Sequence, residues 1–159
     1  MLKHTLKKMF LVIVMSVFTI NVHAADWTMA SGYPKSNFHT QNIMKFIDEV
    51  KANTSVNINL NENDTLIKID AIKTALQRGQ IPIGEIRLGI YGNEDPMYIL
   101  AGLPFIAPDY SSAWLLKDVQ MGYLQEKFGK KGLMILYTSP WPGQGFYTKT
   151  PVNSVADFK

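Results

Sequence analysis

Residues 26–60 read DWTMASGYPKSNFHTQNIMKFIDEVKANTSVNINL and predict a strand, a helix and a second strand in that order. The opening residues, 26–30, favour a strand, and the turn-forming residues after them indicate a reversal of the chain. The helix that follows has Asn37 or Ser36 as its N-cap. Its buried face is marked by the i, i+3, i+4, i+7 spacing of Ile43, Phe46, Ile47 and Val50. Residues 56–60 alternate apolar side chains with asparagine, as expected of a second strand.

The rest of the sequence continues this alternation of helices and strands. We expect helices at 65–78 and 111–128, strands at 81–88 and 133–138, and one helical turn at 97–101. Gly79 and Gly129 mark the ends of the two helices. The longer helix is expected to turn four apolar side chains inward, those of Trp114, Leu115, Val119 and Tyr123. Phe105 is expected in the core.

Strands that alternate with helices predict α/β architecture, in which a parallel-rich sheet is flanked by helices on both faces. In such sheets ligands bind beyond the carboxyl ends of the strands. We therefore expect a ligand near three loops, at 32–39, 91–96 and 139–145.

The first 24 residues have the layout of a cleavable signal peptide. Lys3, Lys7 and Lys8 give a cationic start, residues 9–20 carry no charge, and residues 22–24 offer a small-x-small cleavage site. The apolar run is shorter than the roughly 20 residues that a membrane anchor needs. We therefore predict export to the periplasm.

Charge and cysteine content exclude several kinds of function. The chain has 16 Lys and Arg against 13 Asp and Glu, and three of these lysines belong to the predicted signal peptide. The remainder is close to neutral, so nothing indicates the basic patch of a nucleic-acid-binding protein. Because the chain has no cysteine, it has no disulfide, thiolate metal site or cysteine nucleophile. Outside the signal peptide His39 is the single histidine, so we expect neither a multi-histidine metal site nor a cofactor.

A set of short motifs runs in order through the predicted mature chain. They are WTMASGYP at 27–34, QRGQIPIGE at 77–85, LPF at 103–105, WPGQG at 141–145, YTK at 147–149 and NSVADFK at 153–159. As an ordered set behind a signal peptide they resemble the amino-terminal part of the extracytoplasmic solute-binding proteins of tripartite ATP-independent periplasmic (TRAP) transporters.

This resemblance implies a periplasmic-binding-protein-like fold, in which two α/β lobes close on a ligand. It places residues 25–138 in a first, incomplete lobe and residues 139–159 at the crossover and the start of a second, truncated lobe. The family's receptors continue past the position of Lys159 with an arginine that pairs with a ligand carboxylate. We therefore expect a fragment that binds its solute weakly or not at all.

Candidate ligand contacts lie on the loops at the strand ends. They are Tyr33, Asn37, His39, Glu85, Trp141, Gln144 and Tyr147. The first three offer a ring face, an amide and an imidazole to a small polar solute. Two of them have alternative roles, since Asn37 also suits a helix cap and His39 an exposed position in the first helical turn.

The other candidates have alternatives as well. An unpaired buried carboxylate is costly, so Glu85 needs a donor from the ligand, from Arg87 or from a backbone amide. Trp141 and Tyr147 can cover an apolar part of the solute, although Trp141 equally suits packing between lobes. Gln144, which stands where many family members have arginine, can donate from its amide.

These observations predict a receptor that captures a small organic acid, a carboxylate or a related solute. The receptor delivers it to integral membrane subunits of a secondary transporter and is not an enzyme. One alternative is a periplasmic adaptor for proteins, which would expose a contiguous apolar patch where a receptor has a concave polar cleft. The other is a hydrolase, although the sequence has no Gly-x-Ser-x-Gly, His-Glu-x-x-His or phosphate-loop motif.

Overall fold

The centre of the fold is a sheet of three strands in the order β2-β1-β3. The structure is a computed structural model that describes residues 25–143 and 147–158, so the predicted signal peptide lies outside the described residues. The strands are β1 (Ala25–Ala30), β2 (Val56–Asn61) and β3 (Ile83–Gly84). Both pairings are parallel, as predicted, so the carboxyl ends of the three strands meet at one edge.

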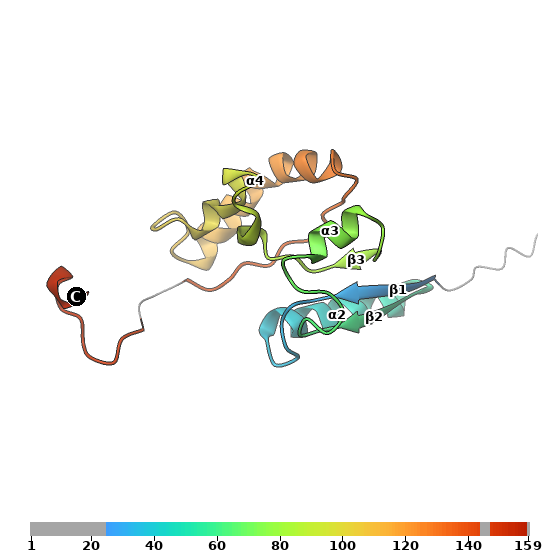
Figure 1. Cartoon of the computed structure of the whole chain (residues 1–159), viewed down its shortest axis with the longest axis horizontal. Coiled ribbons are helices and arrows are strands. Elements are labelled where there is room, and N and C mark those ends of the chain that lie inside the picture. Colours follow the sequence, from blue (N-terminus) through green and yellow to red (C-terminus); the bar gives the residue numbers. More distant parts are fainter. Residues whose placement is uncertain (1–24, 144–146, 159) are drawn as a thin grey trace, which may run out of the picture.

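Helix α2 (Phe38–Asn53) covers one face of the sheet (Figure 1). It begins after Asn37, whose side chain accepts a hydrogen bond of 2.8 Å from the backbone N–H of His39. This confirms Asn37 as the N-cap. On the buried face of the helix Ile43 packs against Met29 and Ile58, and Phe46, Ile47 and Val50 border the same cluster. The helical period in the sequence therefore identified the buried face.

Helix α3 (Ile72–Gln77) packs against the opposite side of β1. Successive strand side chains alternate between faces, so Ala30 points away from its neighbour Met29. Ala30 is fully buried against Ile72, Ala75 and Ile81. The predicted cover of helices on both faces is thus confirmed.

The helix predicted at 65–78 is wrong over its first half, because polar side chains hold residues 62–71 as a loop. Asn63 and Asp64 have positive φ angles of 57° and 59°, outside the range of a right-handed helix. The carboxylate of Asp64 accepts from the backbone N–H of Ile69 at 2.8 Å. Leu66, expected on the buried face, is exposed.

The last two predicted strands are also shorter than expected or missing. β3 has two residues because its partner β1 ends at Ala30, and the N–H of Glu85 makes the next bond, to the carbonyl of Ala30. Residues 133–138 form no strand, since no described strand pairs with them. An extended segment becomes a strand only when a neighbour completes its ladder.

The long helix α4 (Tyr110–Gly129) buries a different face from the predicted one. Gln120, Leu124 and Phe128 are buried, whereas Leu115 is 68% and Val119 is 73% exposed. Trp114 is also exposed, and Tyr123 is half-buried. Apolar side chains are spread around this helix, so its sequence does not favour one face. The expectation for Phe105 is wrong too, because its side chain is 95% exposed.

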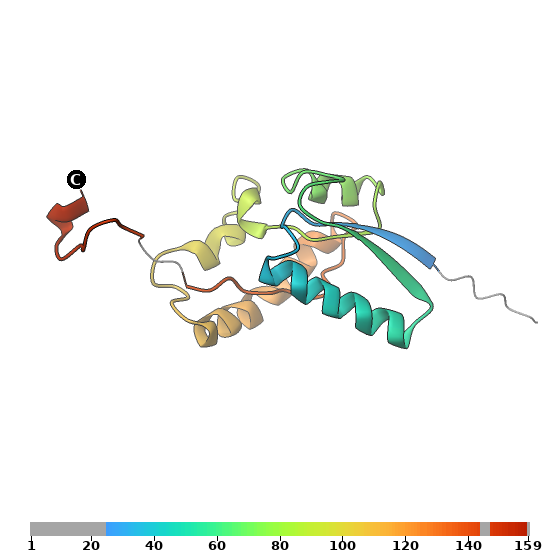
Figure 2. The same ribbon diagram turned by 90° about the horizontal axis from the view of Figure 1, so that it is seen from below.

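α4 belongs to a second packing unit with two 3₁₀ helices, η1 (Leu88–Tyr91) and η2 (Pro96–Gly102). The unit's core consists of Tyr91, Tyr98, Leu124 and Phe128. Glu94 joins it to α3, because its carboxylate pairs with buried Lys73 and with Lys131. Figures 1 and 2 show this unit beside the sheet and a short 3₁₀ helix, η3 (Val155–Phe158), lying away from both.

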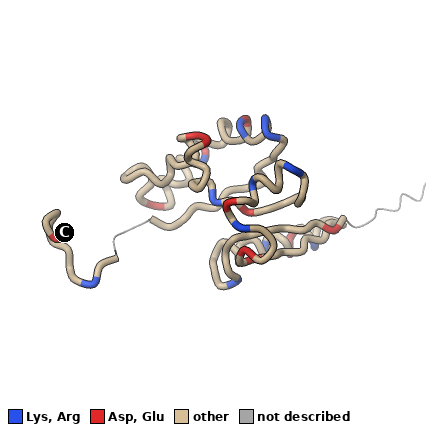
Figure 3. Tube along the Cα trace, viewed as in Figure 1, with Lys and Arg blue, Asp and Glu red and all other residues tan. Residues whose placement is uncertain are grey.

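Charged residues of both signs are interspersed over the described part of the chain (Figure 3). Figure 3 shows no basic stripe there, which agrees with the neutral balance of the sequence. Within residues 25–143 and 147–158 no helix is both long enough and apolar enough to cross a membrane.

Candidate functional site

The candidate site starts where β1 and β3 end. Ser31 follows β1 and is fully buried, and its hydroxyl donates a 2.5 Å hydrogen bond to Oε2 of Glu85, which follows β3. Burial raises the pKa of the Glu85 carboxyl, and the hydrogen bond from Ser31 opposes this rise. Ser31, rather than Arg87, is therefore the protein partner of this carboxylate.

The loop after β1 is held in place by close contacts. Gly32 packs so tightly that a Cβ at this position would lie 2.4 Å from Cβ of Ile69. The carbonyl of Tyr33 accepts from the backbone N–H of Asn63 at 2.9 Å and from the hydroxyl of Thr40 at 3.2 Å. These contacts fix the direction in which the Tyr33 side chain leaves the backbone.

Four rings gather at this edge of the sheet, and we call Tyr33, Phe38, His39 and Trp141 the aromatic cluster. The imidazole of His39 is central, with ring centroids 4.1 Å from Phe38, 4.5 Å from Trp141 and 5.8 Å from Tyr33. Trp141 also meets Tyr33 and Phe38 edge-on, at 5.3 Å and 5.4 Å. The cluster therefore joins the loop after β1 and the start of α2 to the segment 139–143.

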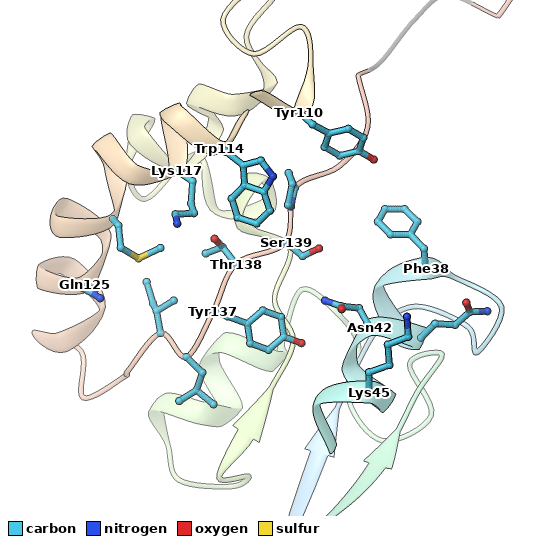
Figure 4. Close-up of a pocket in the computed structure, with 15 residues that line it drawn as sticks. Phe38, Asn42, Lys45, Tyr110, Trp114, Lys117, Gln125, Tyr137, Thr138 and Ser139 are labelled. Carbon is cyan, nitrogen blue, oxygen red and sulfur yellow. The ribbon is translucent and has the colours of Figure 1, made fainter. Parts of the chain in front are cut away.

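Three buried polar atoms have no hydrogen-bond partner among the described residues, two of them in this cluster and the third on Thr138, which Figure 4 draws toward Trp114 of α4. They are the hydroxyl oxygen of Tyr33, Nε2 of His39 and Oγ1 of Thr138. An unsatisfied buried polar atom costs about 1–3 kcal/mol, so such atoms often mark the place of a missing partner. Together they offer a hydroxyl, an imidazole nitrogen and a second hydroxyl to a polar solute.

Burial and two opposite charges set the electrostatics around Tyr33. Burial raises the pKa of its hydroxyl, the charge of nearby Arg87 lowers it, and the charge of Glu85 raises it. The Arg87 side chain also approaches this hydroxyl as a donor, which lowers the pKa further, although the contact falls outside the geometry of a full hydrogen bond. Burial likewise raises the pKa of Tyr137, and the charge of Glu85 adds to the rise. Burial alone lowers the pKa of His39.

A hollow of about 880 Å³ opens beside the cluster, between α2 and α4 (Figure 4). Figure 4 shows Asn42 and Lys45 on one side, with Trp114 and Lys117 on the other. Phe38, a member of the aromatic cluster, and Thr138 both line the hollow. No Asp or Glu is among the lining residues. In the described residues no group of three or more His, Cys, Asp or Glu suits a metal ion.

The structure brings together some of the sequence-predicted residues and separates others. Tyr33, His39 and Trp141 form one cluster, with Glu85 acting electrostatically on Tyr33. The alternative that His39 is an exposed residue is wrong, because it is 5% exposed. Tyr147 is 94% exposed, and its ligand contact stays a prediction. Gln144 lies outside the described residues.

Sequence reasoning missed Ser31, Phe38 and Thr138, and it named Arg87 only as a possible partner of Glu85. Ser31 was open to prediction, since it directly follows β1 at the edge where ligands bind. Phe38 and Thr138 had no comparable signal, because their roles depend on the approach of segment 139–143 to the start of α2.

The layered parallel sheet, with the candidate site at the carboxyl ends of its strands, defines an α/β lobe of the periplasmic-binding-protein type. Residues 29–159 match the model of the bacterial extracellular solute-binding proteins of family 7, DctP. The chain belongs to this family. A comparison with curated proteins found no match.

Solved structures of receptors agree with this assignment. The chain is 38% identical to DctP6 and to DctP7, extracytoplasmic solute receptors of Bordetella pertussis binding pyroglutamic acid, with TM-scores of 0.72 and 0.79. It covers 40% and 46% of those chains, and they cover 74% and 86% of this one. A marine metagenome TRAP solute-binding protein from an unidentified microbe, specific for pyroglutamate, is 36% identical with a TM-score of 0.78. That match covers 85% of this chain and 45% of the receptor, so this chain spans less than half of each of the three relatives.

Proposed function

We propose that this chain carries the solute-recognising lobe of a TRAP-type periplasmic receptor, and that its solute is a small cyclic carboxylate of the pyroglutamate class. The carrying observation is the pair of buried polar atoms without partners on Tyr33 and His39, whose rings are in contact at the end of the sheet where the parallel strands finish. The identity of 36–38% to three receptors described as pyroglutamate-binding supports the choice of solute.

The chemistry of pyroglutamate suits the groups at this edge. Its five-membered ring is flat enough to lie against an aromatic face, and the rings of the aromatic cluster supply such faces. Its lactam N–H is a donor for the carboxylate of Glu85, which has acceptor capacity beyond the hydrogen bond from Ser31. Its carbonyl and carboxylate oxygens are acceptors for the Tyr33 hydroxyl, the Thr138 hydroxyl and the His39 imidazole.

The receptor acts in this proposal by binding alone, without catalysis, and works in the periplasm with membrane subunits of the transporter. Family membership favours this role over a protein adaptor or a hydrolase. A solute that contacts two lobes stabilises their closed arrangement, which the membrane subunits can then recognise. This lobe supplies one of the two contact surfaces.

Thermal unfolding of the purified full chain tests the function, with pyroglutamate at millimolar concentration. A ligand that binds only the native state stabilises it by about 2.7 kcal/mol at a hundredfold excess over Kd. Although one lobe alone is expected to bind weakly, a solute concentration well above Kd should therefore raise the midpoint. Proline is the matched control, since it has the same ring and carboxylate but a charged amine and no ring carbonyl. We expect no shift with proline.

Two variants localise the effect. Trp141→Ala removes a ring of the aromatic cluster and is expected to abolish the shift, whereas Phe105→Ala removes an exposed ring outside both the cluster and the hollow and is expected to preserve it. A midpoint that stays constant with pyroglutamate and with a panel of other small carboxylates would contradict the proposed function.

A further inference from the structure

We propose that His39 recognises the carboxylate of the solute through Nε2, and that solute binding is accompanied by uptake of a proton on this imidazole. The inference rests on the solute-binding function proposed above. It assigns one charge-recognising residue and predicts how affinity depends on pH.

The first support is the packing of His39. The residue is 5% exposed, and its ring contacts those of Phe38, Tyr33 and Trp141 at centroid distances of 4.1 Å, 5.8 Å and 4.5 Å. Its Nε2 is buried without a partner. The backbone N–H of His39 is already used by the Asn37 cap, so the free hydrogen-bonding capacity lies on the imidazole.

The second support is the absence of charge against the ring. Tyr33 faces it from the loop after β1, Phe38 from α2 and Trp141 from segment 139–143, and of these only Tyr33 titrates. The nearby charges, Glu85 and Arg87, act on Tyr33, whereas burial is the one cause of the shift at His39. Because burial lowers its pKa, the imidazole is neutral at pH 7 in the free protein.

A bound carboxylate reverses the preference of the buried imidazole for its neutral form. It places a negative charge beside the buried ring, which favours the imidazolium form and raises the pKa of His39 in the complex. The solute itself stays ionised above pH 5, since an α-carboxyl has a pKa of about 3.5. The complex therefore holds one more proton than the free protein in the window between the free and bound pKa values. Affinity rises as pH falls through this window, by up to about tenfold per pH unit for one proton.

Access to Nε2 requires movement of one side chain. The indole of Trp141 lies edge-on to the imidazole at 4.5 Å and is 42% exposed, on a segment without helix or strand. In this proposal Trp141 therefore has to move aside, because Nε2 is buried in the present arrangement.

Calorimetric titration of the full chain with pyroglutamate tests the inference between pH 5 and pH 8. Each pH is measured in two buffers of different ionisation enthalpy, which yields the number of protons taken up. We expect tighter binding at the acidic end and an uptake that approaches one proton. His39→Gln keeps a donor at the reach of Nε2 but does not titrate, so it is expected to bind with little dependence on pH.

Glu85 needs its own control, because burial raises the pKa of its carboxyl above the ordinary value. Glu85→Gln is expected to retain the pH dependence that His39→Gln loses. A titration of the His39 Hε1 resonance, with and without pyroglutamate, provides a second readout that does not depend on a variant folding. We expect the bound form to titrate at higher pH.

The outcomes separate the inference from the function. Binding that is independent of pH in the unmodified chain, or a pH dependence that survives in His39→Gln, overturns the role of His39 and leaves the receptor function intact. Absence of binding at every pH overturns both.

Discussion

The hydroxyl of Ser31 donates a 2.5 Å hydrogen bond to Oε2 of Glu85, and this bond joins the residue after β1 to the residue after β3. The same two segments are tied by a backbone bond of 2.9 Å from the N–H of Glu85 to the carbonyl of Ala30. The base of the candidate site is therefore built where two parallel strands end, and its carboxylate is positioned by the sheet.

Removing the Ser31 hydroxyl is expected to destabilise the fold. Ser31→Ala leaves a largely buried carboxylate without its donor, and the free energy of unfolding at pH 7 should fall by about 1–3 kcal/mol. Urea unfolding measures this change, with the exposed Ser36→Ala as control, for which we expect less than about 0.5 kcal/mol. A double-mutant cycle with Glu85→Gln isolates the pair, and a coupling energy near zero would contradict the role of this bond.

The raised pKa of Glu85 should contribute to the dependence of the protein's stability on pH. Its pKa is raised in the folded protein, so between the ordinary value of 4.5 and the raised value the folded state binds more protons than the unfolded state. This group therefore makes stability fall as pH rises through that window. Asp109, whose pKa is lowered by hydrogen bonds from Ser112, contributes the opposite slope.

The two contributions can be separated by measuring urea unfolding from about pH 2 to pH 7, because the window of Asp109 lies below its ordinary value of 3.8 and that of Glu85 above 4.5. The difference between the unmodified chain and Glu85→Gln should show stability lost on raising the pH. The difference for Asp109→Asn should show stability gained. Equal slopes for the two differences would be incompatible with the burial of Glu85.

Lys73 and Glu94 form an ion pair, and replacing Glu94 should destabilise the fold more than replacing Lys73. The Lys73 side chain is 3% exposed and lies 3.9 Å from the ring centroid of Tyr91, whereas Glu94 is 40% exposed and also pairs with Lys131. Glu94→Gln leaves a buried ammonium without its counter-charge and should cost about 3 kcal/mol, the lower end for breaking a buried pair. Lys73→Met keeps the apolar stem and leaves a hydrated carboxylate, so we expect about 1 kcal/mol.

Chemical denaturation of both variants checks this order, with Glu126→Gln as control. Glu126 forms an exposed i, i+4 pair with Lys130, and its loss should leave the stability almost unchanged. A larger effect for Lys73→Met than for Glu94→Gln would refute the proposed cost of the buried charge.

Substitution of alanine for glycine at two positions should change the stability of the fold in opposite directions. At Gly32 a Cβ would lie 2.4 Å from the side chain of Ile69, so Gly32→Ala is expected to destabilise by about 1–3 kcal/mol. At Gly122, inside α4, a Cβ meets nothing within 4 Å, so Gly122→Ala should stabilise by about 0.5–1 kcal/mol. Thermal unfolding of the two variants decides the matter, and a stabilising Gly32→Ala would show that the loop after β1 is not tightly packed.

The sequence by itself was enough to predict the elements that depend on interactions between residues close together in the chain. β1, α2 and β2 lie where residues 26–60 place them, and the cap at Asn37 and the buried face through Ile43 follow from local spacing. The layered α/β architecture and the location of the site at the strand ends also follow, because alternation of strands and helices leaves few arrangements. The candidate residues Tyr33, His39 and Trp141 could therefore be selected from their positions near the predicted strand ends.

The tertiary structure decided what depends on contacts between distant segments. The length of β3 is set by where β1 ends, and the buried face of α4 is set by Tyr98 and its neighbours in the second packing unit. The contact of Trp141 with His39 and the bond from Ser31 to Glu85 join residues far apart in the chain. Local propensity acts over a few residues, whereas these pairings depend on packing and burial that exist only once the chain has folded.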